Sequence, residues 1–128
     1  LMDNALKYVL VFVGGGLGSC LRFAIGSLIQ SRSSGFPWAT LCVNLTGALL
    51  IGVFLGAFIG SGWNPNWRVV VAVGLLGGYT TFSAFAYESL ELLESRHWSH
   101  LAGYFFGTNV VGLGACWLGV ALGRCLLA

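Results

Sequence analysis

The chain has 128 residues, of which 57% are hydrophobic and only 8% are charged. Soluble domains carry roughly 25% charged residues, so this chain has too few to cover a water-facing surface. The net charge of +2 comes from six basic and four acidic side chains, too sparse a set for a nucleic-acid interface. We therefore expect an integral membrane protein whose surroundings are a lipid bilayer, with no nucleic acid as partner.

Four apolar segments are long enough to cross a bilayer, because a hydrocarbon core of about 30 Å needs about 20 helical residues. They cover residues 6–29, 40–59, 69–93 and 101–127, to within a few residues. The connectors hold both prolines and most of the tryptophans, Trp38, Trp63, Trp67 and Trp98, where an aromatic belt is expected. The sequence predicts an all-α integral membrane protein with one domain of four transmembrane helices, residues 1–128.

The first two spans contain polar residues with open roles. Arg22 lies toward the end of the first span. Arginines inside a membrane are functional candidates by default, but this position also allows the side chain to reach the interface, so we expect a vestibule or structural role. In the second span Asn44 follows Thr40 by one turn. Its amide can donate N–H groups to an anion, although hydrogen bonding between helices is the alternative.

The third span contains residues that do not suit a helix in lipid. Gly77 and Gly78 weaken it near its middle, and Thr80, Thr81 and Ser83 follow with hydroxyl groups. Non-helical backbone at membrane depth is tolerated only where it is buried in protein or lines a wet cavity. Carbonyl groups freed in such a break are suitable ligands for a sodium-sized cation. The alternative is a glycine kink in which the threonines bond to the preceding turn.

Two phenylalanines and a stripe of acids follow this predicted break. Phe82 and Phe85 are three residues apart and share one helix face. The positive edges of aromatic rings can hold an anion without a hydrogen bond, although core packing is the alternative role. Glu91 and Glu94 are expected at the interface. For Glu88 three roles stay open: carrying a proton, lining an exit, or accepting a hydrogen bond from a neighbouring helix.

The fourth span contributes hydrogen-bond donors. Tyr104 and Thr108 are four residues apart and are expected to face the same way, with Asn109 adjacent. Each is also compatible with hydrogen bonding between helices. Because no lysine or arginine lies deep in the third or fourth span, the donors suit a small hydrated anion that must also leave. His97 and His100, in the preceding connector, supply too few ligands for a metal site.

Cysteine and glycine are expected to serve packing. The four cysteines stand apart within apolar runs and are expected to be small apolar fillers; they are Cys20, Cys42, Cys116 and Cys125. Glycine recurs at intervals of four, a spacing that lets helices approach closely in lipid, at Gly52, Gly56 and Gly60, at Gly103 and Gly107, and at Gly119 and Gly123. The spacing does not identify which helices meet.

Basic residues are spread almost evenly between the two sides of the predicted membrane domain. Lys7, Arg68 and Arg124 lie on the side of the termini, whereas Arg32 and Arg96, with Arg22, lie on the other. The Lys/Arg difference that sets orientation is therefore close to nil. Insertion in both orientations would permit an antiparallel dimer of one sequence, with a two-fold axis in the membrane plane. A single, weakly biased orientation is the alternative.

Three motifs resemble those of the Fluc, or CrcB, fluoride channels: "GGGLGSCLRF" in the first span, "PWATLCVNLTG" in the second and "GLLGGYTTFSAF" in the third. The resemblance covers nearly the whole chain. It implies an antiparallel, dual-topology homodimer with two fluoride pores and a structural Na+ ion at its centre. It also implies a bacterial inner membrane as the location.

The resemblance further implies roles for individual residues. The sodium ligands would be the backbone carbonyls of Gly77 and Thr80 from each copy. The residues bordering fluoride would be Asn44, Phe82, Phe85, Tyr104 and Thr108. Further pore or vestibule candidates are Arg22, Thr40, Thr81, Ser83, Glu88 and Asn109. By the same resemblance, Tyr104 and Thr108 would begin a track of polar residues on the fourth helix. The chain departs from the family pattern at Tyr79, Ala84 and Gly112. The glycine at position 112 leaves the far end of that track to Asn109 or to water.

The function implied is passive, fluoride-selective export that protects the cell against fluoride. The alternative is a small proton-coupled multidrug exporter of dual topology. That mechanism needs a membrane carboxylate, which such exporters place in the first helix, whereas here only Glu88 on the third is available. A structural subunit would have no use for the break, and no nucleophile–base pair or metal cluster favours an enzyme.

Overall fold

The computed structural model describes residues 3–30 and 35–126, and the regular elements of these residues are all helical. Four segments are long and apolar enough to cross a membrane: Asn4–Gln30, Trp38–Phe58, Arg68–Glu94 and Trp98–Leu126. Each end lies within one helical turn of the predicted span, and the prediction of an all-helical chain with four segments long and apolar enough to cross a membrane is confirmed for the described residues. The predicted end of the last span at residue 127, and Arg32 in the first connector, lie outside the described residues.

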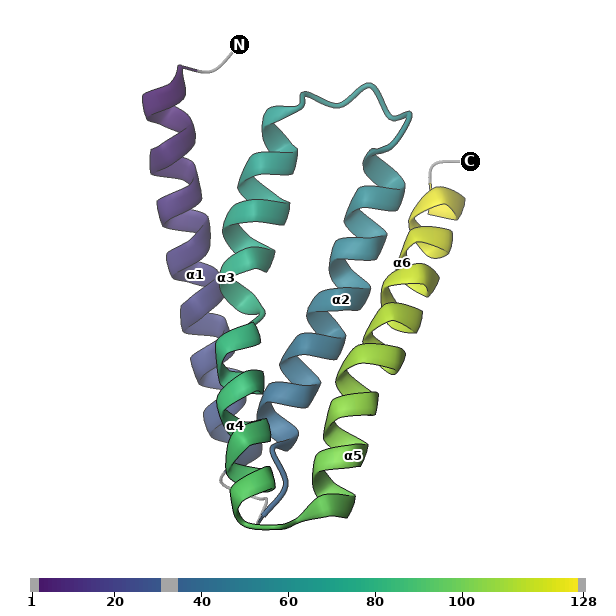
Figure 1. The fold of residues 1–128 in the computed structure, drawn as a ribbon. Helices are drawn as coiled ribbons and strands as arrows, with labels where there is room; N and C mark the ends of the chain where they lie inside the picture. Colours follow the sequence, from purple (N-terminus) through teal and green to yellow (C-terminus); the bar gives the residue numbers. More distant parts are fainter. Residues whose placement is uncertain (1–2, 31–34, 127–128) are drawn as a thin grey trace.

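The first two spans are single helices, α1 (Asn4–Gln30) and α2 (Trp38–Phe58). The third comprises η1 (Arg68–Leu76), α3 (Gly77–Tyr79) and α4 (Phe82–Glu94), and the fourth comprises α5 (Trp98–Phe106), η2 (Gly107–Val111) and α6 (Gly112–Leu126). Figure 1 shows α1 beginning and α6 ending at the same end of the molecule as the connector between α2 and η1. This arrangement agrees with the predicted up-and-down order of the four spans.

Two segments are π-helical rather than α-helical, η1 and η2. In η1 the widened turn continues to its end, where the Gly77 N–H bonds to the Ala72 carbonyl, five residues earlier. This widening was not predicted from the sequence. Because π-helical turns are rare and frequently occur at functional sites, the third and fourth spans are the place to look for such a site.

Glycine allows two pairs of helices to pack at backbone distance. In the first pair, α1 lies against η1 and α3, and a Cβ added at Gly78 would collide with the backbone of Gly15. In the second pair, α2 lies against α6 (Figure 1), and a Cβ at Gly52 would collide with the Cys116 carbonyl. Close approach of this kind stabilises helix pairs in lipid, where the hydrophobic effect does not drive helices together.

The predicted glycine rows are thus confirmed in part. Gly52 and Gly56 on α2 face Gly119 and Gly123 on α6. Two members of the predicted rows do not pack against another helix of the chain: Gly60 lies in a connector with φ of +85°, and a Cβ added at Gly103 would meet no atom of another element within 4 Å. The +85° backbone angle, which side chains rarely tolerate, explains the glycine at position 60.

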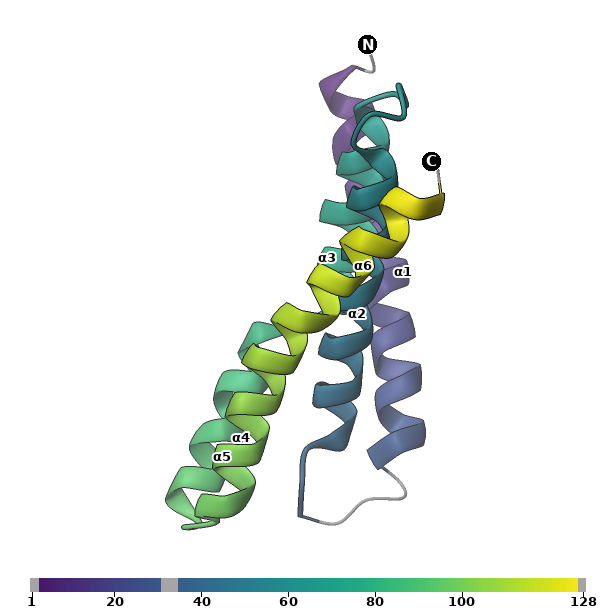
Figure 2. The same cartoon turned by 90° about the vertical axis from the view of Figure 1, so that its right-hand side faces the viewer.

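The remaining half of the molecule is held differently. In Figure 2, α4 and α5 run together and lean away from α1. A small core joins them to α2, formed by the side chains of Leu41, Phe85, Leu92 and Tyr104. Helix α5 begins at Trp98, so His100 lies in its first turn and not in the connector where we expected it.

Candidate functional site

The helical break lies at Thr80 and Thr81. Both residues are extended, with φ and ψ of −81° and 160° for Thr80 and −148° and 120° for Thr81. The prediction that the third span is broken is confirmed, but Gly77 and Gly78 remain helical in α3. The physical reason is that Gly78 provides the close contact with α1, while β-branched threonines adopt extended backbone readily.

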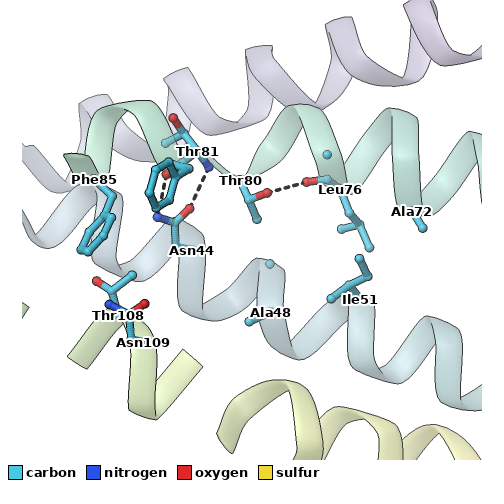
Figure 3. Close-up of a pocket in the computed structure, with 13 residues that line it drawn as sticks. Asn44, Ala48, Ile51, Ala72, Leu76, Thr80, Thr81, Phe85, Thr108 and Asn109 are labelled. Carbon is cyan, nitrogen blue, oxygen red and sulfur yellow. Dashed lines mark hydrogen bonds between the residues drawn. The ribbon is translucent and has the colours of Figure 1, made fainter. Parts of the chain in front are cut away.

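Asn44 on α2 binds the peptide groups of the break (Figure 3). Its Nδ2 donates to the Thr81 carbonyl over 2.9 Å, and its Oδ1 accepts from the Thr81 N–H over 2.8 Å. The side-chain amide therefore completes a paired arrangement like that between two strands. Since an unsatisfied backbone group in lipid costs several kcal/mol, these two bonds allow the chain to leave the helix at this depth.

Helix α4 restarts with its own cap. The hydroxyl oxygen of Thr81 accepts from the Ala84 N–H over 3.2 Å, as an N-cap residue does. The Thr81 and Ser83 hydroxyl oxygens lie 3.2 Å apart. Before the break, the Thr80 hydroxyl donates to the Leu76 carbonyl over 3.1 Å, so this threonine also bonds to the preceding turn, as the kink alternative proposed.

A cavity of about 340 Å³ opens beside the break (Figure 3). Its chemically distinctive lining residues are Asn44, Gly77, Thr80, Thr81, Phe82, Phe85, Thr108 and Asn109. They come from α2, α3, the break, α4 and η2, so residues predicted from separate spans meet in one space. Within the described chain, the Thr108 hydroxyl is buried without a hydrogen-bond partner. A buried, unpaired donor of this kind is unusual and is available to a small anion.

Phe82 and Phe85 both line this cavity, with ring centroids 5.7 Å apart. Their surroundings differ: Phe85 is 5% exposed and packs on Tyr104 and Phe105, whereas Phe82 is 77% exposed. The Phe85 ring is therefore held in place by neighbouring side chains, whereas most of the Phe82 side chain is not covered by the rest of the chain.

Glu88 is bonded to two neighbouring helices. Its Oε1 accepts from the Thr40 hydroxyl over 2.8 Å, and its Oε2 accepts from the Tyr104 hydroxyl over 2.6 Å. Of the three roles left open for Glu88, these bonds correspond to the third. Tyr104 is fully buried here and does not line the 340 Å³ cavity, so it does not share that space with Thr108, which we expected to face the same way.

Arg22 lines a second cavity of about 280 Å³, together with Ser19, Thr40 and Thr81. Thr81 therefore lies between the two cavities, because it lines both. The vestibule role expected for Arg22 stays a prediction.

Sequence reasoning missed two contacts that hold the break. The Tyr79 and Thr46 hydroxyl oxygens lie 2.8 Å apart and join α3 to α2. The Ser19 hydroxyl donates to the Gly78 carbonyl over 3.3 Å and joins α1 to α3. The only signal for the first pair was the departure from the family pattern at position 79.

The cysteines and histidines lie apart from this site or in small groups in the part of the chain that the structure describes. Within it, no group of three or more His, Cys, Asp or Glu side chains is placed to hold a metal ion, and the four cysteines are free. The His97 and His100 rings stack with centroids 5.7 Å apart.

Comparison with known proteins identifies the family of the chain. Residues 9–120 match the family described as CrcB-like protein, Camphor Resistance (CrcB). The chain is 43% identical over 122 residues to a fluoride-specific ion channel FluC of Thermus thermophilus, covering 94% of this chain and 98% of that one. It is 40% identical over 119 residues to FluC 1 of Listeria monocytogenes serotype 4b, with 92% and 98% covered, and 44% identical over 124 residues to FluC of Rhizobium meliloti, with 93% and 97% covered. This multi-pass membrane protein belongs to the CrcB family.

Proposed function

We propose that this chain is a fluoride-selective ion channel that lets fluoride leave the cell passively and so protects against its toxicity. Relatives over nearly the full length are named fluoride-specific ion channels. The observation that carries the proposal is the single cavity in which the break meets Phe82, Phe85 and the unpaired Thr108 hydroxyl.

The chemistry of this cavity suits an ion that is held weakly. Its lining includes amide, hydroxyl and aromatic groups but no lysine or arginine among the described residues. The positive edges of Phe82 and Phe85 attract an anion, and the Thr108 hydroxyl donates a hydrogen bond in place of water. Conduction requires binding that is strong enough for entry and weak enough for exit, and uncharged donors and ring edges meet that requirement without a lysine or arginine side chain.

A second copy of the chain is part of the proposal, as an antiparallel, dual-topology homodimer in the bacterial inner membrane. Phe82 is 77% exposed and Ser83 and Asn109 are exposed too, all near the middle of their spans. Polar groups facing hydrocarbon at that depth are costly, so the open side of the cavity needs protein to cover it. The near-even spread of basic residues allows the second copy to insert in the opposite direction.

The break also fits a structural sodium ion. Gly77 and Thr80 both line the 340 Å³ cavity. In a continuous helix their carbonyls would accept from the N–H groups of Thr81 and Ala84, but these donors bond to Asn44 and to the Thr81 hydroxyl instead. Carbonyl oxygens relieved of their helical donors suit a hard cation. A bound Na+ would be coordinated by carbonyl oxygens of both copies and would so hold the two copies together.

The bonds of Glu88 weaken the alternative of a proton-coupled multidrug exporter. Both of its carboxylate oxygens already accept hydrogen bonds, from Thr40 and Tyr104. Both oxygens are thus occupied by donors from the same chain, whereas a coupling residue must be free to exchange a proton and a substrate in each cycle.

The test is fluoride efflux from liposomes that contain the purified protein, with a potassium ionophore to relieve charge and chloride measured in parallel. We expect fast, ionophore-dependent loss of fluoride with little loss of chloride. Phe85→Ile and Phe82→Ile should each impair the flux while the dimer still assembles. Absence of flux from a folded dimer would refute the channel, and unchanged flux in both variants would refute the role of the rings.

A further inference from the structure

The amide of Asn44 does more in this structure than face a cavity. Its Oδ1 accepts the N–H of Thr81 over 2.8 Å, and in a continuous α-helix that N–H would be donated to the carbonyl four residues earlier, at Gly77. A single side-chain oxygen on α2 therefore decides whether the Gly77 carbonyl is engaged within the helix or open to the cavity. The second bond of the amide, from Nδ2 to the Thr81 carbonyl over 2.9 Å, fixes its orientation.

The hydrogen bonds between Asn44 and Thr81 also affect the carbonyl of Thr80, the second proposed cation ligand. With its peptide held by Asn44, Thr81 is extended and its hydroxyl caps α4 by accepting the Ala84 N–H. That N–H would otherwise be donated to the carbonyl of Thr80. Thus both carbonyls proposed as cation ligands lose their helical donors through one residue, Thr81, and Asn44 holds that residue in place.

We infer that Asn44 is a positioning residue for the cation site, acting through its Oδ1 atom on the backbone of the break. The inference rests on the proposed sodium site and deepens it. It separates two functions of one side chain: the Oδ1 acceptor opens the carbonyls, while the remaining N–H of the amide faces the ion path. The two functions can be separated by substitution, because aspartate keeps an acceptor at this position and loses the donors.

A matched control lies two residues along α2. The Thr46 hydroxyl lies 2.8 Å from the Tyr79 hydroxyl and joins α2 to the other side of the break. Thr46 is close to Asn44 in sequence and also loses one contact with the third span when changed. However, its hydrogen bonds involve neither Thr81 nor Ala84, so Thr46→Val leaves the donors of the two carbonyls where they are.

The experiment measures thermal unfolding of the purified dimer in detergent while sodium replaces choline at constant ionic strength. A ligand that binds only the folded state stabilises it by RT ln(1 + [L]/Kd), so the midpoint of the sodium response reports affinity without any flux measurement. We expect the wild type and Thr46→Val to respond at similar sodium concentrations. Asn44→Leu should need at least roughly tenfold more sodium for the same stabilisation. Asn44→Asp keeps the acceptor for the Thr81 N–H but loses the donor to the Thr81 carbonyl, so it should still respond to sodium, at a concentration nearer that of the wild type than that of Asn44→Leu.

Flux measured on the same preparations completes the test. We expect Asn44→Asp to lose fluoride flux while its sodium response persists, because a negative charge repels the anion but still accepts the Thr81 N–H. A wild type that responds to sodium, with Asn44→Leu responding equally, would overturn the inference alone. A wild type without any sodium response would overturn the inference together with the proposed sodium site. If Asn44→Leu fails to assemble, loss of the sodium response in Asn44→Asp overturns the inference.

Discussion

Replacing Gly119 by alanine tests whether α2 and α6 are held by backbone contact. A Cβ at this position would overlap the Leu49 carbonyl oxygen and lie 2.9 Å from the Val53 nitrogen and 3.0 Å from the Gly52 Cα. All three neighbours are backbone atoms, so no side chain can rotate out of the way. The helices must move apart to accommodate the methyl group.

The size of the effect follows from two opposing terms. Alanine is favoured over glycine inside a helix by about 0.5–1 kcal/mol, whereas overpacking by one carbon costs typically about 1–3 kcal/mol. Because the neighbours of Gly119 are rigid, we take the upper end of the second range and expect a net loss of about 2 kcal/mol. Gly114, on the same helix with no atom within 4 Å of its added Cβ, is the matched control. Gly114→Ala should gain about 0.5–1 kcal/mol.

The assay is reversible unfolding in mixed detergent micelles, followed by far-ultraviolet circular dichroism, for both variants and the wild type. The expected difference of about 3 kcal/mol between the variants corresponds to roughly a hundredfold change in the unfolding equilibrium. If Gly119→Ala is as stable as Gly114→Ala, then α2 and α6 do not meet at backbone distance, and the reasoning from glycine packing fails.

Three further changes probe the polar contacts. Tyr104→Phe keeps the buried ring but removes the 2.6 Å hydrogen bond to Glu88. In the same assay it should lower the free energy of unfolding by about 1–2 kcal/mol, because hydrogen bonds between membrane helices contribute about 0.6 kcal/mol on average and bonds to charged groups roughly 1.5–3 kcal/mol. An unchanged free energy of unfolding would contradict this bond. Tyr79→Phe should cost about 0.5–1 kcal/mol by losing its bond to Thr46, and Thr46→Val in the same background should then add little if the pair interacts. Arg22→Gln should slow fluoride flux more at low than at high ionic strength, because salt screens the cation; equal slowing at both would argue against an electrostatic role.

Features set by local sequence were predictable. Each span is a predominantly apolar segment of sufficient length, so its extent could be predicted to within one turn, and Trp38 and Trp98 begin helices as an interfacial residue should. The existence of the break was predictable for the same reason, since glycine, threonine and serine gather in one short stretch. Local sequence predicted the break at the wrong residues, because its position depends on the hydrogen bond between Thr81 and Asn44, which lies on another helix.

Contacts between distant residues were the limit of prediction. Glu88 finds its partners 48 residues earlier, at Thr40, and 16 residues later, at Tyr104. The stripe of acids on the third span distinguished Glu88 from Glu91 only by its depth, because the bonds of Glu88 depend on how α4 and α5 lie against α2. The facing of Tyr104 was predicted from a regular helix, but the π-helical segment that begins at Gly107 alters the turn between it and Thr108.

The two halves of the molecule hold together by different means, and this difference bears on how variants should be interpreted. Glycine brings α1 to η1 and α2 to α6, but α4 and α5 are joined to α2 by a small apolar core and by hydrogen bonds from Thr40 and Asn44. Because lipid gives helices no hydrophobic reason to associate, removing a polar side chain here loosens the fold as well as the proposed ion path. A loss of flux at these positions is therefore evidence about the ion only when stability, measured on the same variant, is unchanged. By that criterion a variant of Phe82 gives the most direct test of contact with the ion, because most of this side chain is not covered by its own chain. A variant of Tyr104 gives the least direct test, because this side chain is fully buried.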